Sequence, residues 1–305
     1  MKENKQNMGN WVRVCQDGRS IKPPGPRLTY PRLFFCGIGV YMVSNITLKV
    51  RILGSGTSTG VPTIGCNCSV CMSKDPRNKR RRSSILMTRK DTKENLVIDT
   101  TPDFRMQILD AKISQLGNVL YTHTHADHCH GFDDLRAFYF FNKKSINCYL
   151  SKEFHSEFTT RFSYAFTNTG YKGTTPQVEL KEIPKGSFKV LGIEIEPVRL
   201  PHGTMQTTGF RFGSFAYITD FKVFPKRLLA KWKGKIRTMI ASGVRYKPHP
   251  THSTVDETIQ LFRDLEVAKG YITHLSHEID HERDSASLPD HISFAYDGLE
   301  FEVVI

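Results

Sequence analysis

The segment 122–128, Thr-His-Thr-His-Ala-Asp-His, contains a dense group of potential metal ligands. Its three imidazoles and one carboxylate belong to His123, His125, Asp127 and His128. Such groups hold zinc and similar divalent ions at catalytic sites. The segment follows the apolar run 119–121, so a strand ending here presents all four groups at one sheet edge, spaced for two adjacent ions. A chance histidine-rich loop is the alternative, but only 12 of 305 residues are histidine. The segment therefore predicts a metallohydrolase.

Three further potential ligands stand where other strands are expected to end. These residues are His202, Asp220 and His274, and each follows a short stretch of mostly apolar residues. Taken singly, each is more often a structural histidine or a turn aspartate. Together with the first group they provide five imidazoles and two carboxylates, which is enough for two metal ions.

The pattern His-x-His-x-Asp-His, followed by isolated His, Asp and His, resembles that of the metallo-β-lactamase superfamily. The resemblance implies an α/β fold, a four-layer αβ/βα sandwich of two mixed sheets with helices outside. It also implies two catalytic divalent ions, zinc or manganese. One would be held by His123, His125 and His202, and the other by Asp127, His128 and His274. Asp220 would bridge the two ions. Two ions about 3.5–4 Å apart share a water and lower its pKa from about 15.7 toward 7.

A second group of potential ligands is the thiol loop formed by Cys66, Cys68 and Cys71. Three thiolates are one ligand short of a tetrahedral zinc site. The loop and its surroundings resemble the cyclic-phosphate phosphodiesterase branch of the superfamily, from about residue 46 to the C-terminus. The matching stretches are 54–62, 65–71, 75–78, 82–84, 98–105 and 296–298. In that branch a histidine completes a structural zinc site, and the matching residue is His277. Free, reduced cysteines are the alternative.

The same resemblance implies a catalytic role for His252, whose position matches the proposed general acid of the branch. An exposed histidine that precedes a helix is an equally weighted alternative. The predicted activity is in-line hydrolysis of a small or cyclic phosphodiester by the hydroxide shared between the two ions. His252 would protonate the departing oxygen.

Two other functions stay open on the sequence. A nuclease like tRNase Z shares the first strand, the ligand set and an Arg-x-Ser-Ser-like element, and the net charge of +13 suits a polyanion. The thiol loop argues against it, as does the lack of an evident tRNA-gripping arm in 151–187. A non-catalytic protein like the pyrroloquinoline-quinone branch shares the thiol loop, but the complete ligand set argues against a degenerate site. The expected partner is a small phosphorylated substrate, with nucleic acid less favoured and a homodimer possible.

Composition separates a leader from one hydrolase domain. Residues 1–41 hold seven Lys or Arg against two Asp or Glu and show no periodicity, which predicts a disordered leader, or an upstream extension if translation begins at Met42. Residues 42–305 are expected to form the hydrolase domain. No apolar run approaches the roughly 20 residues that span a membrane. Seven cysteines, three of them clustered, suit a reducing cytoplasm better than a disulfide framework.

The elements that must position these ligands follow from periodicity. Strands are expected at 46–53, 83–87, 95–99, 118–121, 146–150, 193–200, 208–212, 215–219, 238–241 and 271–273, and helices at 102–109, 132–141, 224–232 and 254–265. Residues 151–187 are expected to form a helix and a lid-like loop. Asp297-Gly298 predicts a closing hairpin over 294–301. The apolar residues of 132–141 are expected in the core, and the basic run 79–82 in a solvated loop, with attraction of a phosphorylated substrate as the alternative.

Overall fold

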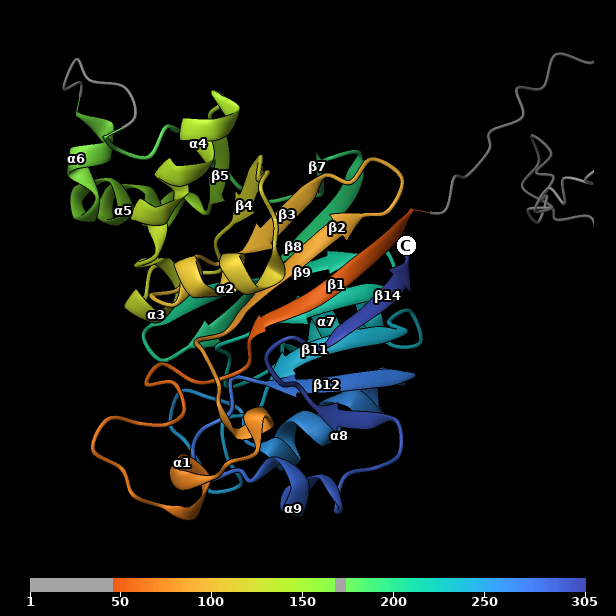
Figure 1. Cartoon of the computed structure of the whole chain (residues 1–305). Helices are drawn as coiled ribbons and strands as arrows, with labels where there is room; N and C mark the ends of the chain where they lie inside the picture. The colour runs from red at the N-terminus through yellow and green to blue at the C-terminus, as the bar shows by residue number, and fades with distance from the viewer. Residues whose placement is uncertain (1–45, 168–173) are drawn as a thin grey trace, which may run out of the picture. The chain divides into compact units, whose positions relative to one another are not determined.

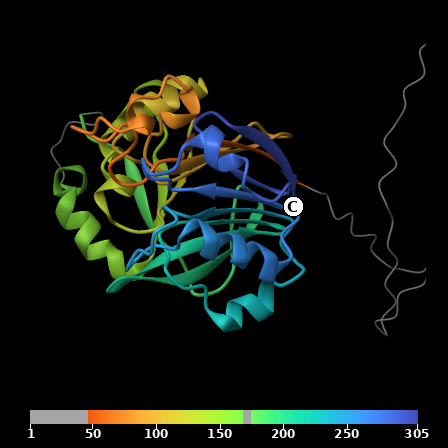
Figure 2. The same cartoon turned by 90° about the horizontal axis from the view of Figure 1, so that it is seen from below.

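The computed structural model describes residues 46–167 and 174–305. The expected leader, residue Met42 and the cysteines at positions 15 and 36 lie outside these residues. From Ser44 to Ile305 the chain clusters as one compact unit. Within the described part, two seven-stranded sheets lie face to face, with helices on both outer sides (Figures 1 and 2). This is the four-layer sandwich of the α/β class that the sequence predicted, and the fold prediction is confirmed.

The first sheet combines an antiparallel and a parallel half. Its strands, in spatial order, are β14 (Glu300–Val304), β1 (Thr47–Gly54), β2 (Ser84–Arg89), β3 (Asn95–Ile98), β4 (Asn118–Leu120), β5 (Ile146–Leu150) and β6 (Val178–Glu182). Pairing is antiparallel from β14 to β3 and parallel from β3 to β6. The outer face packs against α2 (Phe104–Ala111), α3 (Ala126–Cys129), α4 (Arg136–Asn142), α5 (His155–Arg161) and α6 (Ser163–Phe166).

The second sheet is built the same way. Its strands, in spatial order, are β13 (Ile292–Phe294), β12 (Lys269–Thr273), β11 (Thr238–Ser242), β10 (Phe215–Ile218), β9 (Met205–Phe212), β8 (Ile193–His202) and β7 (Phe188–Val190). Pairing is parallel from β13 to β10 and antiparallel from β10 to β7. Helices α7 (Lys226–Trp232) and α8 (Val255–Leu265) cover its outer face.

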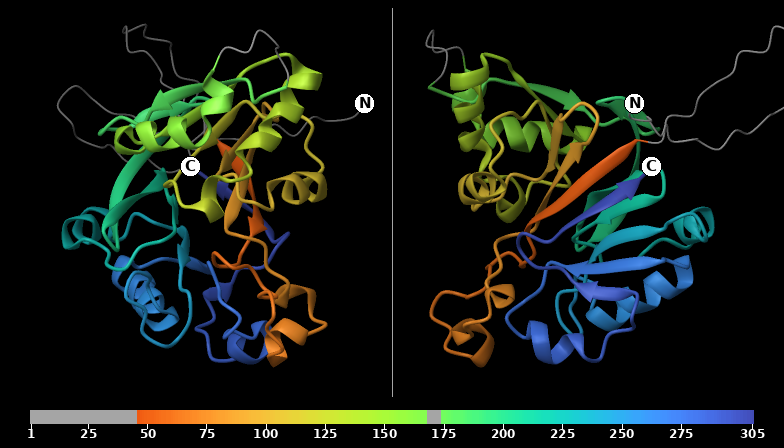
Figure 3. Two further views of the ribbon diagram at one scale, coloured as in Figure 1. Left: turned by 90° about the vertical axis from the view of Figure 1, so that its left-hand side faces the viewer. Right: turned by 45° about the vertical axis from the view of Figure 1, so that its right-hand side comes forward.

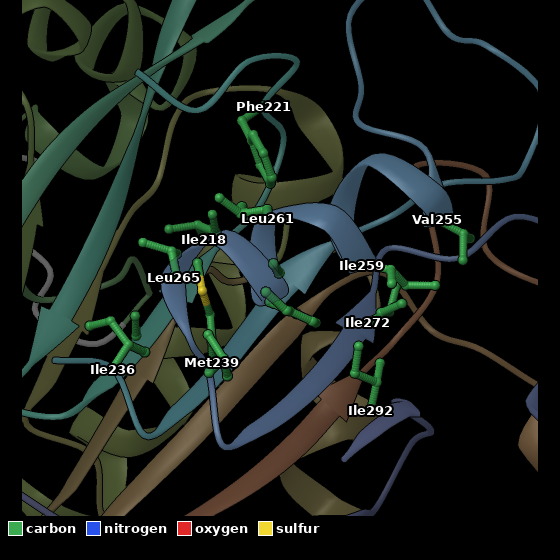
Figure 4. Packing of buried hydrophobic residues seen from close by; sticks show 14 of the residues in the cluster. Ile218, Phe221, Ile236, Met239, Val255, Ile259, Leu261, Leu265, Ile272 and Ile292 are labelled. Carbon is green, nitrogen blue, oxygen red and sulfur yellow. The ribbon is translucent and has the colours of Figure 1, made fainter. Parts of the chain in front are cut away.

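Helix α8 shows how sequence produces this packing. Thr254 caps its N-terminus, because the Thr254 hydroxyl accepts the N–H of Glu257 while the Glu257 carboxylate accepts the N–H of Thr254. Its apolar residues recur at helical spacing, and Ile259, Leu261 and Leu265 lie against the sheet (Figure 4). Burying a side chain of this size contributes about 1.5–3 kcal/mol. The helix thereby fixes β11 and β12, the strands that precede two loops of the site.

The core between the sheets is apolar and shared by both. It includes Val50, Ile52, Ile98, Phe210, Tyr217 and Ile240, each fully buried. Because both sheets contribute, their strand ends are held in one fixed relation. Loops that follow β3, β4, β10 and β12 can therefore meet across the sheets.

The backbone turns sharply where three of these strands end. Asp99 follows β3, Asp220 follows β10 by two residues, and His274 follows β12 directly. Their φ angles are 67°, 53° and 59°, in the left-handed region that non-glycine residues rarely occupy. Such conformations cluster at functional sites, where the surrounding structure holds them in place.

The predicted C-terminal hairpin is wrong. Strand β13 pairs in parallel with β12, whereas β14 pairs with β1 in the other sheet, so the segment crosses between sheets. Asp297 does not lie in an exposed turn. Its carboxylate accepts the N–H and hydroxyl of Ser55 and the N–H of Arg81, at 2.8–2.9 Å. The turn itself is present, because Leu299 donates its N–H to the backbone oxygen of Tyr296 at 3.1 Å, but the segments on either side of it pair with other strands instead of with each other.

The segment 132–141 also differs from the prediction. It begins as a 3₁₀ helix, Phe132–Leu135, before α4. Phe132 and Phe138 are buried as expected, but Phe140 and Phe141 are 46% and 85% exposed. They lie two and three residues beyond Phe138, on the side turned from the sheet. The short elements β6, β7, α1 (Ser69–Met72) and α9 (His281–Ser285) were not predicted. Among the described residues, no helix has the length and apolarity to cross a bilayer.

Candidate metal-dependent active site

The first ligand group joins the two sheets. His123 and His125 follow β4, and His202 ends β8. Their candidate ligand atoms all lie within 4.8 Å of one another. Ring centroids are 4.6 Å apart for His123 and His125, and 5.2 Å apart for His125 and His202. The three imidazoles therefore converge on one point, as the sequence predicted for one metal ion.

The second ligand group is formed by Asp127, His128 and His274. Asp127 and His128 lie in α3, directly after the first group, and His274 comes from the loop after β12. The Asp127 Oδ2 atom lies 3.2 Å from His128 Nε2 and 3.7 Å from His274 Nε2. The candidate ligand atoms of this group also lie within 4.8 Å of one another. The structure thus brings together the residues predicted for a second ion.

Asp220 lies between the two groups. Its Oδ2 atom is 3.1 Å from His128 Nε2 and its Oδ1 atom is 3.2 Å from His274 Nε2. A carboxylate oxygen of Asp220 also lies within 4.8 Å of the ligand atoms of His123 and of His202. Asp220 is 2% exposed and is therefore placed where a shared ligand is needed.

The buried nitrogens of this cluster support metal binding. Among the described residues, Nε2 of His123 and both ring nitrogens of His274 are buried without a hydrogen-bond partner. Buried polar atoms are normally partnered, so such a concentration calls for a ligand. Burial lowers the pKa of His123 well below its usual value, which keeps the imidazole neutral and able to coordinate. Nitrogen and carboxylate donors in this number suit zinc or manganese.

A second layer of hydrogen bonds orients the ligands, and it centres on Asp99. The Asp99 Oδ2 atom lies 2.7 Å from His128 Nδ1 and accepts the Thr122 hydroxyl at 2.8 Å. That hydroxyl lies 2.9 Å from Nδ1 of His123. One fully buried carboxylate therefore orients a ligand of each group, directly for His128 and through Thr122 for His123.

Other contacts fix the loops around the ligands. Arg161 of α5 donates to the backbone oxygen of Thr124, and the Thr124 hydroxyl donates to Glu157 at 2.8 Å. His202 Nδ1 lies 3.0 Å from the backbone oxygen of Thr251. These contacts hold the histidine loop and the end of β8 in place. Asp99, Glu157 and Arg161 were not among the predicted site residues, although Asp99 stood at a predicted strand end.

His252 lies beside the ligands rather than on an exposed loop. Its Nδ1 atom is 3.5 Å from Asp220 Oδ1, and its ring stacks on His274 with centroids 5.0 Å apart. His249 Nδ1 accepts the backbone N–H groups of Thr251 and His252 at 3.3 Å, which shapes this turn. Burial, partly opposed by Asp220, lowers the pKa of His252 to about 3 in the metal-free protein.

A cavity of about 470 Å³ opens onto the cluster. It is lined by His125, Asp127, His202, Asp220, His252 and His274, with Ser58, Thr251 and residues 203–205 around them. Small-molecule sites have volumes of about 300–1,000 Å³. A small molecule that filled this cavity would therefore contact both ligand groups and His252 at once.

The thiol loop forms a separate, closed cluster. Nδ1 of His277 lies 3.1 Å from Sγ of Cys66, 3.5 Å from Sγ of Cys68 and 3.7 Å from Sγ of Cys71. In a tetrahedral zinc site, sulfur and nitrogen ligands lie about 3.6 Å apart, so the four residues fit this ion. The backbone N–H of Cys71, followed by His277, lowers the pKa of Cys68 to about 6, despite the opposing effect of burial. This favours the thiolate that zinc binds.

The cluster joins two distant parts of the chain. The segment that contains α1 lies beside the segment before α9 (Figure 3). His274 and His277 are three residues apart in the chain, and His274 lies at the cluster around Asp220 while His277 lies at the thiol cluster. Cys129 and Cys148, which matched no ligand pattern, are buried free thiols.

Within the basic run 79–82, Lys79 is exposed as the sequence predicted, but the three arginines are buried or half-buried. The Arg80 side chain is buried and 2% exposed. Arg81 pairs with Asp110 at 2.6 Å, and Arg82 pairs with Asp103 at 3.0 Å. Local composition predicted solvent exposure, but the folded chain supplies partners for these guanidinium groups.

Comparison with known proteins agrees with this site. A family model described as a beta-lactamase superfamily domain matches residues 94–275. A crystal structure of a new diphosphatase from the PhnP family is 36% identical in sequence, with a TM-score of 0.79, covering 86% of this chain and 99% of that one. Zinc-bound PqqB from Methylobacterium extorquens has a TM-score of 0.67 over 84% of this chain and 100% of that chain. At 20% identity it shows the fold alone.

One curated relative matches over most of the chain. An octanoyltransferase of Porphyromonas gingivalis is 38% identical over 256 residues, which cover 83% of this chain and 51% of that protein. The chain thus spans about half the length of this relative, and a third of the length of the coenzyme PQQ synthesis protein B of Methylorubrum populi, which matches over 101 residues at 34% identity. The family model covers more than half of the chain, and the PhnP-family structure matches nearly the whole of its own chain, so these two matches establish the family. The chain belongs to the metallo-β-lactamase superfamily of metal-dependent hydrolases, in its PhnP branch.

Proposed function

We propose that the protein is a dinuclear metal-dependent phosphodiesterase that hydrolyses a small or cyclic phosphodiester. The observation behind this proposal is the position of Asp220, between two ligand groups that share one cavity with His252. His123, His125 and His202 would hold one ion, Asp127, His128 and His274 the other, and Asp220 would bridge them. Zinc or manganese ions in these positions supply a nucleophile at neutral pH and neutralise phosphate charge.

The residues of the chain have separable tasks in this proposal. Asp99 and Thr122 keep His128 and His123 in the orientation that coordination needs. His252, on the wall of the cavity, protonates the departing oxygen, in keeping with its predicted acid role. That role requires a protonated imidazole, and a bound phosphodiester anion raises the pKa of a neighbouring histidine.

The four residues Cys66, Cys68, Cys71 and His277 would bind a structural zinc. The cluster has no position left for a substrate once four ligands are in place. Three thiolates must stay reduced to bind metal, which favours a reducing compartment such as the cytoplasm.

A small substrate suits the cavity better than a nucleic acid does. The volume of about 470 Å³ matches a ligand of nucleotide size. Arg81 and Arg82, which contribute to the positive net charge, are paired with carboxylates. A homodimer remains a proposal from the superfamily resemblance alone.

The PhnP-family structure favours a second candidate substrate, a diphosphate. That protein is called a diphosphatase, and the match covers 99% of its chain. Diphosphate and phosphodiester hydrolysis need the same ligand set, because both displace oxygen at phosphorus.

Hydrolysis assays with four substrates test the proposal. Metal-loaded protein is offered bis-(p-nitrophenyl) phosphate, a 2′,3′-cyclic nucleotide, a dinucleoside diphosphate and a thioester. Cleavage of either phosphodiester supports the proposal, and selective cleavage of the diphosphate supports the second candidate. Cleavage of the thioester with all three phosphate compounds left intact would overturn both. Binding of a tRNA precursor that weakens steeply with salt would favour the tRNase Z-like alternative.

A further inference from the structure

We propose that Arg80 is a positioning residue for both metal centres. From outside the cavity it fixes the backbone of segment 274–279, which provides His274 to the proposed dinuclear site and His277 to the thiolate cluster. The inference rests on the proposed metal sites, and it adds a residue that acts on them through the chain rather than by coordination.

The guanidinium of Arg80 binds this segment directly. Nη1 donates to the backbone oxygen of Ser276 at 2.9 Å, and Nη2 donates to the backbone oxygen of Ile279 at 2.8 Å. Nη2 also donates to Oδ1 of Asn78, and Nε donates to the backbone oxygen of Arg77 at 3.2 Å. The two carbonyls that it binds in the segment lie on either side of His277. One side chain thus binds the loop between His274 and His277, at Ser276, and again two residues after His277, at Ile279.

Burying the guanidinium of Arg80 costs free energy unless its N–H groups find hydrogen-bond acceptors. Arg80 is 2% exposed, and among the described residues it forms no ion pair; its hydrogen-bond acceptors are carbonyl oxygens. Burial lowers the pKa of Arg80 to about 10, so the side chain stays charged near neutral pH. A buried charge is tolerated when its donors are satisfied, and the planar fork of arginine reaches several acceptors at once.

The opposite side of the segment is held by backbone bonds. Leu275 donates its N–H to the oxygen of Ser55 at 2.8 Å and accepts the N–H of Thr57 at 3.1 Å. Ser276 donates its N–H to the oxygen of Val244. His274 itself has a positive φ of 59°, a conformation that must be imposed by its surroundings. Arg80 adds side-chain hydrogen bonds to that constraint, at Ser276 and Ile279.

The adjacent arginine provides a matched control. Arg81 has the same charge and stands next in the chain, but its side chain is 31% exposed and pairs with Asp110 at the surface. Replacing Arg81 removes a similar charge without touching segment 274–279.

The test measures zinc binding rather than activity. Chelator competition is used to count and rank the bound ions in wild type, Arg80→Ala, Arg80→Lys and Arg81→Ala. The thiolate-to-cobalt absorption of the cobalt-loaded protein reports separately on the cysteine cluster. We expect Arg80→Ala to weaken the weaker-held ion of the pair at least about 10-fold, the range seen when supports of metal ligands are removed. The ion affinity of Arg80→Lys should lie between those of Arg80→Ala and wild type, and the ion affinity of Arg81→Ala should match wild type.

A purely structural role is excluded by the pattern of results. Such a role lowers the melting temperature while leaving ion affinities and the cobalt spectrum unchanged, and that outcome in folded Arg80→Ala overturns the proposal. If Arg80→Ala does not fold, Arg80→Lys is combined with His277→Ala. Both changes act on one segment, so their effects on affinity for the pair should be non-additive, and additive effects overturn the proposal. Wild-type protein that binds no ion pair would instead defeat the proposed dinuclear site.

Discussion

The two ligand clusters are built from different parts of the fold. The cluster around Asp220 takes its residues from the ends of β4, β8, β10 and β12, in both sheets. Three of the four thiolate-cluster residues come instead from the loop between β1 and β2, whose only regular elements are α1 and a 3₁₀ helix of three residues within the described chain. A packed core supports the first cluster, whereas only Val61 and Val70, with the cysteines themselves, form an apolar cluster at the second.

This contrast indicates how each cluster depends on metal. Strand ends fixed by two sheets hold their ligands in place before an ion binds. A loop with little apolar burial depends more on the ion and on hydrogen bonds for its shape, because metal binding then contributes to folding itself. Loss of metal should therefore abolish chemistry at the first cluster and loosen structure at the second.

The largest expected effect tests the first half of this contrast. Asp220→Ala removes the residue placed between the two groups, and we expect phosphodiester hydrolysis to fall by roughly 10³-fold, which corresponds to about 4 kcal/mol. The melting temperature of the metal-free protein should change little by comparison. Steady-state kinetics and thermal unfolding measure the two quantities. Near wild-type turnover in the metal-loaded variant would contradict the role of Asp220.

The next effect tests the second half. Cys68→Ser should remove one zinc per chain, counted by elemental analysis, because the site then lacks a thiolate. A ligand present at about 100 times its Kd stabilises a protein by about 2.7 kcal/mol, so a loss of that order is expected in unfolding free energy. Cys148→Ser, at a buried cysteine outside the cluster, is the comparison for zinc content. A Cys68→Ser protein with undiminished zinc would refute the structural site.

A smaller effect distinguishes support of a ligand from coordination. Asp99→Asn keeps the shape of the side chain but removes the charge that faces His128 and Thr122. We expect affinity for the ion pair to fall about 10–100-fold, or about 1.4–2.8 kcal/mol, with the thiolate zinc unaffected. Competitive chelation measures both. An equal loss at the two clusters would mean that Asp99 acts on the whole fold.

The smallest effect probes the core that holds the strand ends. Ile240 of β11 is fully buried between the sheets, and Ile240→Val should lower unfolding free energy by about 1 kcal/mol. Denaturant unfolding measures this change, with Val304→Ala at a 53% exposed position as the control. Ion affinities at both clusters should stay at wild-type values. A marked drop in affinity at the strand-end cluster would show that its geometry has little tolerance for changes in packing.

Much of the fold was predictable because its causes are local. The alternation at 46–53 predicted β1, and the period of 254–265 predicted α8, including the region of its Thr254 cap. Prediction failed where distant residues decided the outcome. Asp297-Gly298 forms the turn that its local chemistry predicts, but the flanking strands β13 and β14 pair with β12 and β1 rather than with each other.

The surface was predicted less well than the strands. Phe140 and Phe141 match the apolar composition of a core helix, but the end of α4 turns them to the outside. Residues 79–82 match a solvated loop by composition, but Arg80 finds carbonyl acceptors almost 200 residues along the chain. Composition alone does not predict whether a side chain points into the core or toward solvent.

The sequence by itself determined which residues are candidate ligands, since residue type and spacing specify donor chemistry, and strand ends can be located from periodicity. The resemblance gave the grouping of these residues, and the tertiary structure brought the groups together; only the structure showed that Asp99 contacts both groups and that Arg80 lies inside and binds the segment of His274 and His277. The physical reason is distance along the chain. Donor chemistry belongs to single residues, whereas convergence and burial depend on two sheets packing over one apolar core.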